Sequence, residues 1–174
     1  MPVTVSGSIG LAVKNLKDAI AATSWFQTWT GTANATDAGA RIGFGGRDAN
    51  ESDPTPINGT RPWLLIYPEP GWSSRLVAIN TPLYSPAVIV EAESSVTAGY
   101  AASSDQAQQE AATDWGGLLG TIAGLSGTTI NSIVLMLKSV AETLPPTLQG
   151  DDERTAGGGR WVKWTAMARV EMGI

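Results

Sequence analysis

The chain has 174 residues, of which 16% are charged, with a net charge of -5 and neither histidine nor cysteine. Without these two residue types there is no imidazole base near neutral pH, no thiolate nucleophile, no zinc–cysteine site and no disulfide. The acidic balance, without a cluster of basic residues, also argues against binding to a phosphate backbone. The sequence therefore predicts no enzyme activity, no metal and no cofactor, and it points to assembly or binding by a single domain covering residues 1–174.

Residues 8–30 have the periodicity of one long amphipathic helix. Its apolar stripe consists of Ile9, Val13, Leu16, Ile20, Thr23 and Phe26. Gly31 marks the expected end of this helix. Trp25 and Trp29 form a second apolar pair at helical spacing, which either covers the edge of a sheet or meets another subunit.

Four strands are predicted between the two main helices, at residues 41–44, 62–67, 75–80 and 86–93. The second is an apolar run bounded by prolines, which is typical of a strand buried on both faces. Residues 45–61 are rich in Gly, Asp, Asn and Pro, and we expect a flexible loop there.

A second helix is predicted for residues 102–125. Its core stripe consists of Ala111, Trp115, Leu118, Ile122 and Leu125. Each glycine inside a helix costs about 1 kcal/mol relative to Ala. We therefore expect the glycines of this segment to permit close packing on the sheet.

The stretch 115–137 contains no charged residue. Polar residues in its middle favour two short buried elements joined by a turn over a membrane-spanning helix. Residues 129–142 fit either a helical stripe or a strand. We favour a strand that stops at Pro145 and Pro146.

The last element is a strand over residues 162–172. Its apolar side consists of Val162, Trp164, Ala166, Ala168, Val170 and Met172, alternating with Lys163, Thr165, Arg169 and Glu171. This alternation predicts one buried and one solvated face. The preceding residues, 145–160, include three adjacent carboxylates and three consecutive glycines, and we expect a second flexible loop.

These elements predict an α+β fold. We expect a single, mostly antiparallel β-sheet packed by two main helices, with the N-terminal helix first and the C-terminal strand last, at the edge of the sheet. Glu91 and Glu93 would share one face of a strand, as a catalytic pair does, but an exposed strand end is the simpler interpretation.

This layout resembles the tail terminator proteins of long-tailed bacteriophages and related neck or tail-completion proteins. The similar parts are the helix at residues 16–20, the strand that begins with Arg61 and Pro62, and the ending at 159–173. The resemblance implies a structural virion protein, assembled in the host cytoplasm, whose copies form a homo-hexameric ring in the tail or neck. That ring would cap the tail tube, stop polymerisation of the tail tube protein and join the tail to the head connector or neck protein. DNA would pass through its lumen without specific binding, and no membrane would be involved.

The candidate interface with other subunits or partners combines the tryptophan pair with charged residues of the two loops. It consists of Trp25, Trp29, Asp48, Glu51, Asp53, Asp151, Asp152, Glu153, Arg154 and Arg160. The alternative function is a non-catalytic carbohydrate- or ligand-binding module, because sugars stack on aromatic faces. Trp72, Trp115 and Trp161 are its candidate platforms.

Overall fold

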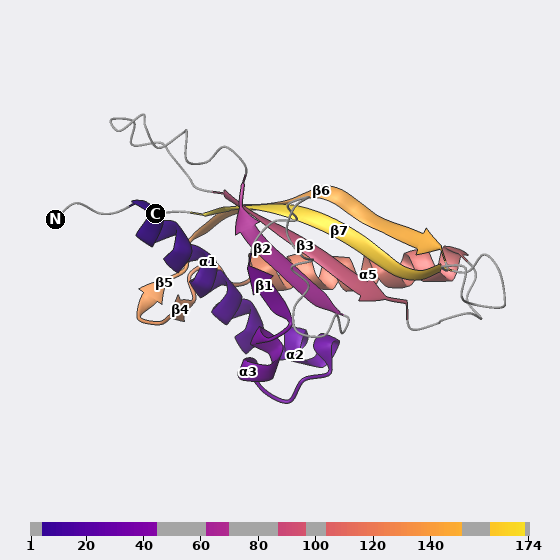
Figure 1. Cartoon of the computed structure of the whole chain (residues 1–174), viewed down its shortest axis with the longest axis horizontal. Coiled ribbons are helices and arrows are strands. Elements are labelled where there is room, and N and C mark those ends of the chain that lie inside the picture. The colour runs from indigo at the N-terminus through magenta and orange to yellow at the C-terminus, as the bar shows by residue number, and fades with distance from the viewer. Residues whose placement is uncertain (1–4, 45–61, 70–86, 97–103, 151–160, 173–174) are drawn as a thin grey trace.

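The computed structural model describes residues 5–44, 62–69, 87–96, 104–150 and 161–172. Within them lies a five-stranded sheet in the order β1-β2-β3-β7-β6. Helices cover one face of this sheet (Figure 1). The strand β1 (Ile42–Phe44) is parallel to β2 (Trp63–Pro68), and the remaining neighbours, β3 (Ala87–Ser95), β7 (Trp161–Met172) and β6 (Leu137–Gly150), are antiparallel. The predicted α+β fold with a mostly antiparallel sheet is confirmed.

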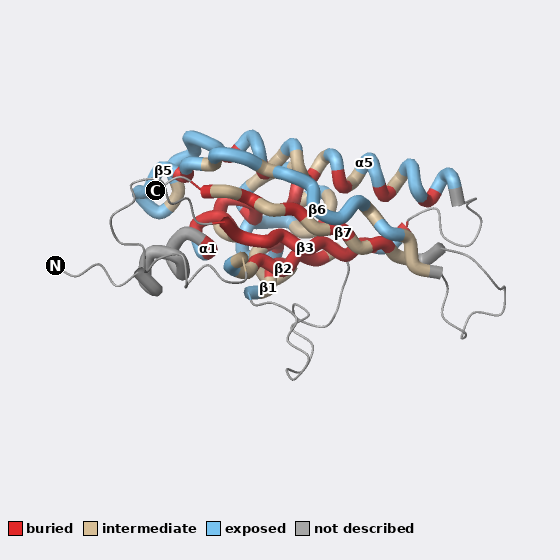
Figure 2. The backbone as a smooth tube through the Cα atoms, turned by 90° about the horizontal axis from the view of Figure 1, so that it is seen from above, coloured by how far each residue is buried: buried red, intermediate tan, exposed pale blue. Residues whose placement is uncertain are grey.

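The C-terminal strand is not at the edge of the sheet, and this part of the prediction is wrong. Strand β7 pairs with β3 from Ala87↔Glu171 to Ser95↔Lys163 and pairs with β6 on its other side. The edge strand on this side of the sheet is β6, whose mostly exposed residues suit a strand with one unpaired side (Figure 2). The apolar alternation of β7 is confirmed, because Trp164, Ala166, Ala168, Val170 and Met172 are all buried.

The predicted long N-terminal helix is two helices, α1 (Val5–Ala22) and α2 (Ser24–Thr30). Thr23 separates them with an extended backbone, at φ -75° and ψ 138°. Its hydroxyl donates to the carbonyl of Ile20 at 2.7 Å and accepts from the amide of Phe26 at 3.3 Å, so it caps the second helix. Gly31 ends α2 at φ 65°, as expected.

A short helix that the sequence analysis did not predict, α3 (Ala35–Gly39), follows α2. Asn34 caps it, because the side-chain oxygen of Asn34 accepts from the amide of Asp37 at 2.9 Å. This helix packs beside α1 and leads the chain into β1.

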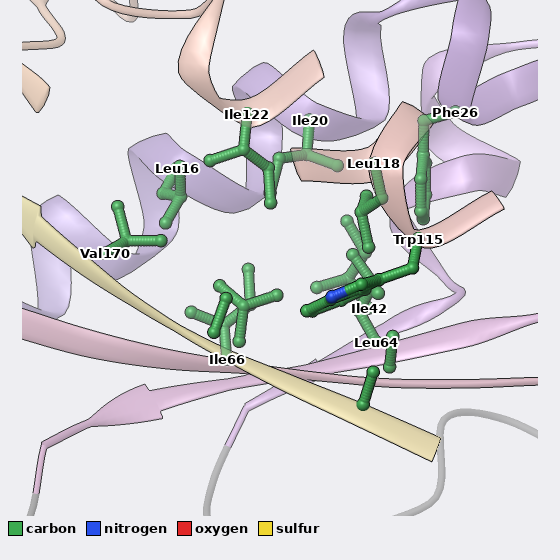
Figure 3. Close-up of a cluster of buried hydrophobic side chains, with 14 of the residues drawn as sticks. Leu16, Ile20, Phe26, Ile42, Leu64, Ile66, Trp115, Leu118, Ile122 and Val170 are labelled. Carbon is green, nitrogen blue, oxygen red and sulfur yellow. The ribbon is translucent and has the colours of Figure 1, made fainter. Parts of the chain in front are cut away.

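The second main helix is α5 (Ser104–Ala123), and its predicted core stripe is confirmed. All five predicted residues are buried: Ala111, Trp115, Leu118 and Ile122, with Leu125 just after the helix. Ala107, which the prediction did not include, extends this stripe toward the start of α5. The stripe faces the sheet, while the opposite side of α5 is exposed (Figure 2). Figure 3 shows Trp115, Leu118 and Ile122 meeting side chains of α1 and β2 in the core.

The ambiguous segment 129–142 is a strand region, as favoured, but it is interrupted. Strands β4 (Thr129–Ile130) and β5 (Ile133–Val134) form a small hairpin, and β6 begins at Leu137. The expected stop at Pro145 and Pro146 is wrong, since β6 continues to Gly150. Two register shifts, at Glu142/Leu144 and Leu144/Thr147, accommodate the prolines on this edge strand.

Several expectations lie wholly or partly outside the described residues. These include the strand at 75–80 and the loop at 45–61. Of the loop expected at 145–160, residues 145–150 belong to β6, which corrects that part of the prediction, and 151–160 are not described.

Strand β7 generates a stability prediction. Ala168 is fully buried opposite Val90, so Ala168→Asp places an unpaired charge in the core and is expected to lower the free energy of unfolding by about 3 kcal/mol or more. Ala141→Asp is the matched control, because Ala141 is exposed on neighbouring β6 and should tolerate the change within about 0.5 kcal/mol. Denaturant unfolding of both variants gives the comparison, and equal midpoints would contradict the described orientation of β7.

Candidate functional site

The two tryptophans of the predicted interface lie together on α2. The rings of Trp25 and Trp29 are stacked, with centroids 5.5 Å apart. Trp29 is 6.2 Å from Trp164 of β7, which in turn is 6.3 Å from Trp115 of α5. Four tryptophans therefore form one row that begins at the half-exposed surface of α2 and ends in the core.

Helix α2 approaches α5 closely at Gly117. A Cβ atom added to Gly117 would lie 2.5 Å from Cζ2 of Trp25. Two carbon atoms that are not bonded to each other do not come this close, so one of them would have to move. The expectation that helix glycines permit packing on the sheet is therefore wrong for Gly117, because this glycine makes room for an indole of another helix. Gly116 and Gly120 have no neighbouring atom within 4 Å of such a Cβ.

An apolar groove of about 410 Å³ lies between α2 and α5, lined by Ser24, Trp25, Thr28, Trp29 and Asp114. Burial raises the pKa of the Asp114 carboxyl; hydrogen bonding from Trp29 opposes this shift, and the charge of Glu110 adds to it. A second groove of about 390 Å³ adjoins the first through Asp114 and is lined by Gln106, Gln109, Glu110 and Thr113. Neither α2 nor α5 contains a lysine or arginine, so the charges that these two helices bring to the grooves are negative.

A different surface is formed by the β4–β5 hairpin, whose turn is held against α1. Asn131 and Ser132 have φ values of 50° and 64°, the left-handed conformation that a two-residue hairpin turn requires. The Asn131 side chain donates to Asn15 at 3.0 Å and to Asp18 at 2.9 Å. Although desolvation opposes the shift, hydrogen bonds from Lys14 and Asn131 lower the pKa of Asp18, which keeps this acceptor charged.

The hairpin and the segment after it expose apolar side chains. Ile133 is 40% exposed, Val134 52% and Met136 53%. The expectation of two short buried elements in the uncharged stretch is thus correct for the end of α5 but wrong for this hairpin. The sequence pattern could not separate the two, because both are uncharged and rich in β-branched or aliphatic residues.

The face of the sheet away from the helices carries charged side chains. Glu91 and Glu93 are only 8% and 5% exposed, so the expectation of an exposed strand end is wrong. Lys163 of β7 lies 3.7 Å from Glu93. Arg169 binds Glu69 at 2.9 Å and Glu171 at 3.2 Å, and the contact with Glu69 is the main cause of its raised pKa. The side of β7 expected to be solvated is therefore half-buried, and its charged residues Lys163, Arg169 and Glu171 are paired.

Of the ten predicted interface residues, the structure describes Trp25 and Trp29 and brings them together. The other eight lie outside the described residues: Asp48, Glu51, Asp53, Asp151, Asp152, Glu153, Arg154 and Arg160. The prediction that Trp115 is a platform for sugar stacking is wrong, because its side chain is 2% exposed and its indole N–H donates to Glu142 at 2.7 Å. Trp72 and the side chain of Trp161 are not described.

Sequence reasoning missed Asp114 and Gly117. The spacing of Glu110 and Asp114, four residues apart, indicates a shared helix face, but only the three-dimensional packing shows that α2 lies beside it.

No protein-family model matches this sequence, and no curated protein matches it significantly. Within the described ranges, no group of three or more acidic side chains is arranged to hold a metal ion. No helix among these residues combines the length and apolar character needed to cross a membrane.

The contact of Trp25 with Gly117 can be tested by substitution. Gly117→Ala forces the indole to move and is expected to lower the free energy of unfolding by about 1–3 kcal/mol. Gly116→Ala adds the same methyl group to open space and should stabilise α5 by up to about 1 kcal/mol. Thermal unfolding followed by circular dichroism measures both, and stabilisation by Gly117→Ala would contradict the described contact.

The raised pKa of Asp114 predicts a pH-dependent stability. The folded protein binds this proton more readily than the unfolded chain, so the stability associated with Asp114 falls as pH rises through its titration. Asp114→Asn should therefore have a higher melting temperature than the wild type at pH 7, with the difference shrinking below about pH 4. A variant that is less stable at pH 7 would show instead that contacts of the carboxylate outweigh its desolvation.

Proposed function

We propose that the chain is a structural virion protein, the tail terminator of a long-tailed bacteriophage. Its copies form a homo-hexameric ring that caps the tail tube, stops polymerisation of the tube protein and joins the tail to the head connector. Assembly takes place in the host cytoplasm, and the protein acts without enzyme activity. The proposal rests on the resemblance in layout of the sequence and on one structural observation, the exposed apolar side chains of β5 and of the segment after it.

The hairpin supports a role in assembly because it is apolar and also held in place. Ile133, Val134 and Met136 are each 40% exposed or more, and apolar side chains gathered on a surface commonly mark a protein–protein contact. Asn131 fixes the turn to α1 through Asn15 and Asp18. A contact element that is already ordered loses little conformational entropy on binding, which favours association.

The charge of the chain is compatible with a ring around DNA. A net charge of -5 repels the phosphate backbone, so DNA passing through a lumen would not be retained.

The particle mass in solution tests this proposal. Light scattering should give a hexamer, either for the protein alone or after addition of tail tube subunits. The double substitution Val134→Asp and Met136→Asp should shift the protein to monomers while leaving its melting temperature nearly unchanged, because both side chains are largely exposed. Ala141→Asp, an equally exposed change on β6, is the control and should keep the ring.

Two results would count against the proposal. A wild-type protein that remains monomeric with and without tube subunits excludes the ring. A double variant that assembles as the wild type does excludes the hairpin as its contact.

A further inference from the structure

We propose that the groove between α2 and α5 binds the arginine side chain of a basic protein partner. The guanidinium would stack on the half-exposed indole of Trp25 and pair with the carboxylate of Asp114. This groove would form one contact of the proposed assembly. The identity of the molecule that brings the arginine rests on the proposed function, whereas the binding of an arginine does not.

The groove has the composition of a site for an organic cation. Of its five lining residues, two are tryptophans with stacked rings and one is a carboxylate. The face of an indole attracts a cation through its negative π-surface, and the attraction grows as the cation loses water. Its volume of about 410 Å³ falls within the range of sites that bury a small ligand group.

The charge distribution favours a partner that brings a positive group. Asp114 forms no ion pair with any residue that the structure describes, although it is partly buried. The neighbouring groove adds Glu110, and α2 and α5 together contain no basic residue. A cation is therefore complementary to the carboxylate of Asp114 in this groove, and an acidic chain with a net charge of -5 is complementary to a basic protein.

Arginine suits this geometry better than lysine. Its planar guanidinium can lie flat on an indole while its edge donates two hydrogen bonds to one carboxylate. The ammonium of lysine is more strongly hydrated and has no plane with which to stack.

The packing of α2 on α5 prepares the site before a ligand arrives. Trp25 lies against Gly117, and Trp29 is held between Trp25 and Trp164. Both rings therefore have fixed positions, so that binding has little side-chain entropy to remove.

The test is a nuclear magnetic resonance titration of the full chain that follows the indole N–H signals of its tryptophans. The probe is blocked arginine, N-acetyl-arginine amide, and the comparison is blocked citrulline, which has nearly the same shape without the charge. Arginine should shift the signals of Trp25 and Trp29 saturably, and citrulline should not. Asp114→Asn should weaken the binding about tenfold, as expected for loss of a charge-assisted hydrogen bond. Asp105→Asn, at the start of the same helix, should leave it unchanged.

The outcomes distinguish this inference from the proposed function. Equal shifts with citrulline or with maltose, or unchanged binding by Asp114→Asn, would overturn the arginine site even if light scattering shows a hexamer. Arginine binding by a protein that never assembles would support the site and refute the ring. If Asp114→Asn loses the hexamer itself, the occupant is a second copy of the chain, and the assignment to a basic partner is wrong.

Discussion

The position of β7 inside the sheet is the constraint on which the rest of the fold depends. One side of this strand presents fully buried apolar residues to the helices, and the other presents half-buried side chains, including an arginine bound to two carboxylates. Both faces of β7 are therefore covered, and its backbone groups are in addition paired with a neighbouring strand along each edge. Strands β3 and β6 are those neighbours, and their pairing with β7 sets the width of the surface on which α1, α2 and α5 lie. Ala166 and Ala168 are fully buried in the same core cluster as the large side chains of these helices.

The break between α1 and α2 at Thr23 determines which side chains of α2 lie beside α5. In a continuous helix, the two tryptophans would follow the direction of α1, whereas the break at Thr23 turns α2 so that its indoles meet α5. The interhelical groove is thus a product of one capping hydroxyl and one glycine. The hairpin surface has a separate origin, since it depends on the hydrogen bonds of Asn131 with α1.

Much of the fold could be predicted from the sequence, because periodicity records which side of an element is buried. The stripe of α5, the apolar side of β7 and the first four residues of β2 all correspond to buried positions. The failures occur where a local pattern is compatible with two environments. Thr23 fits the apolar stripe of a continuous helix, but it caps a second helix instead. Prolines end many strands, but an edge strand tolerates them, as β6 tolerates Pro145 and Pro146. The sequence pattern predicts solvent exposure for Glu91, Glu93 and Arg169. It does so because a sequence does not show which charged side chains pair in the folded protein. The site was predicted only as the pair Trp25 and Trp29, since Asp114 and Gly117 are 85 or more residues away along the chain and only folding brings them near.

The character of β6 has a consequence for how copies of the chain can associate. A long, regular edge strand can extend its backbone ladder into a neighbouring sheet, and such addition repeats without limit and produces fibres. Strand β6 has two prolines, which lack an amide hydrogen, and its register with β7 shifts at four places. An irregular edge of this kind resists ladder extension, so in the proposed ring the contacts between copies would depend on side-chain shape. Shape-determined contacts fix the angle between neighbours, and a fixed angle is the requirement for an assembly that closes on itself rather than growing indefinitely.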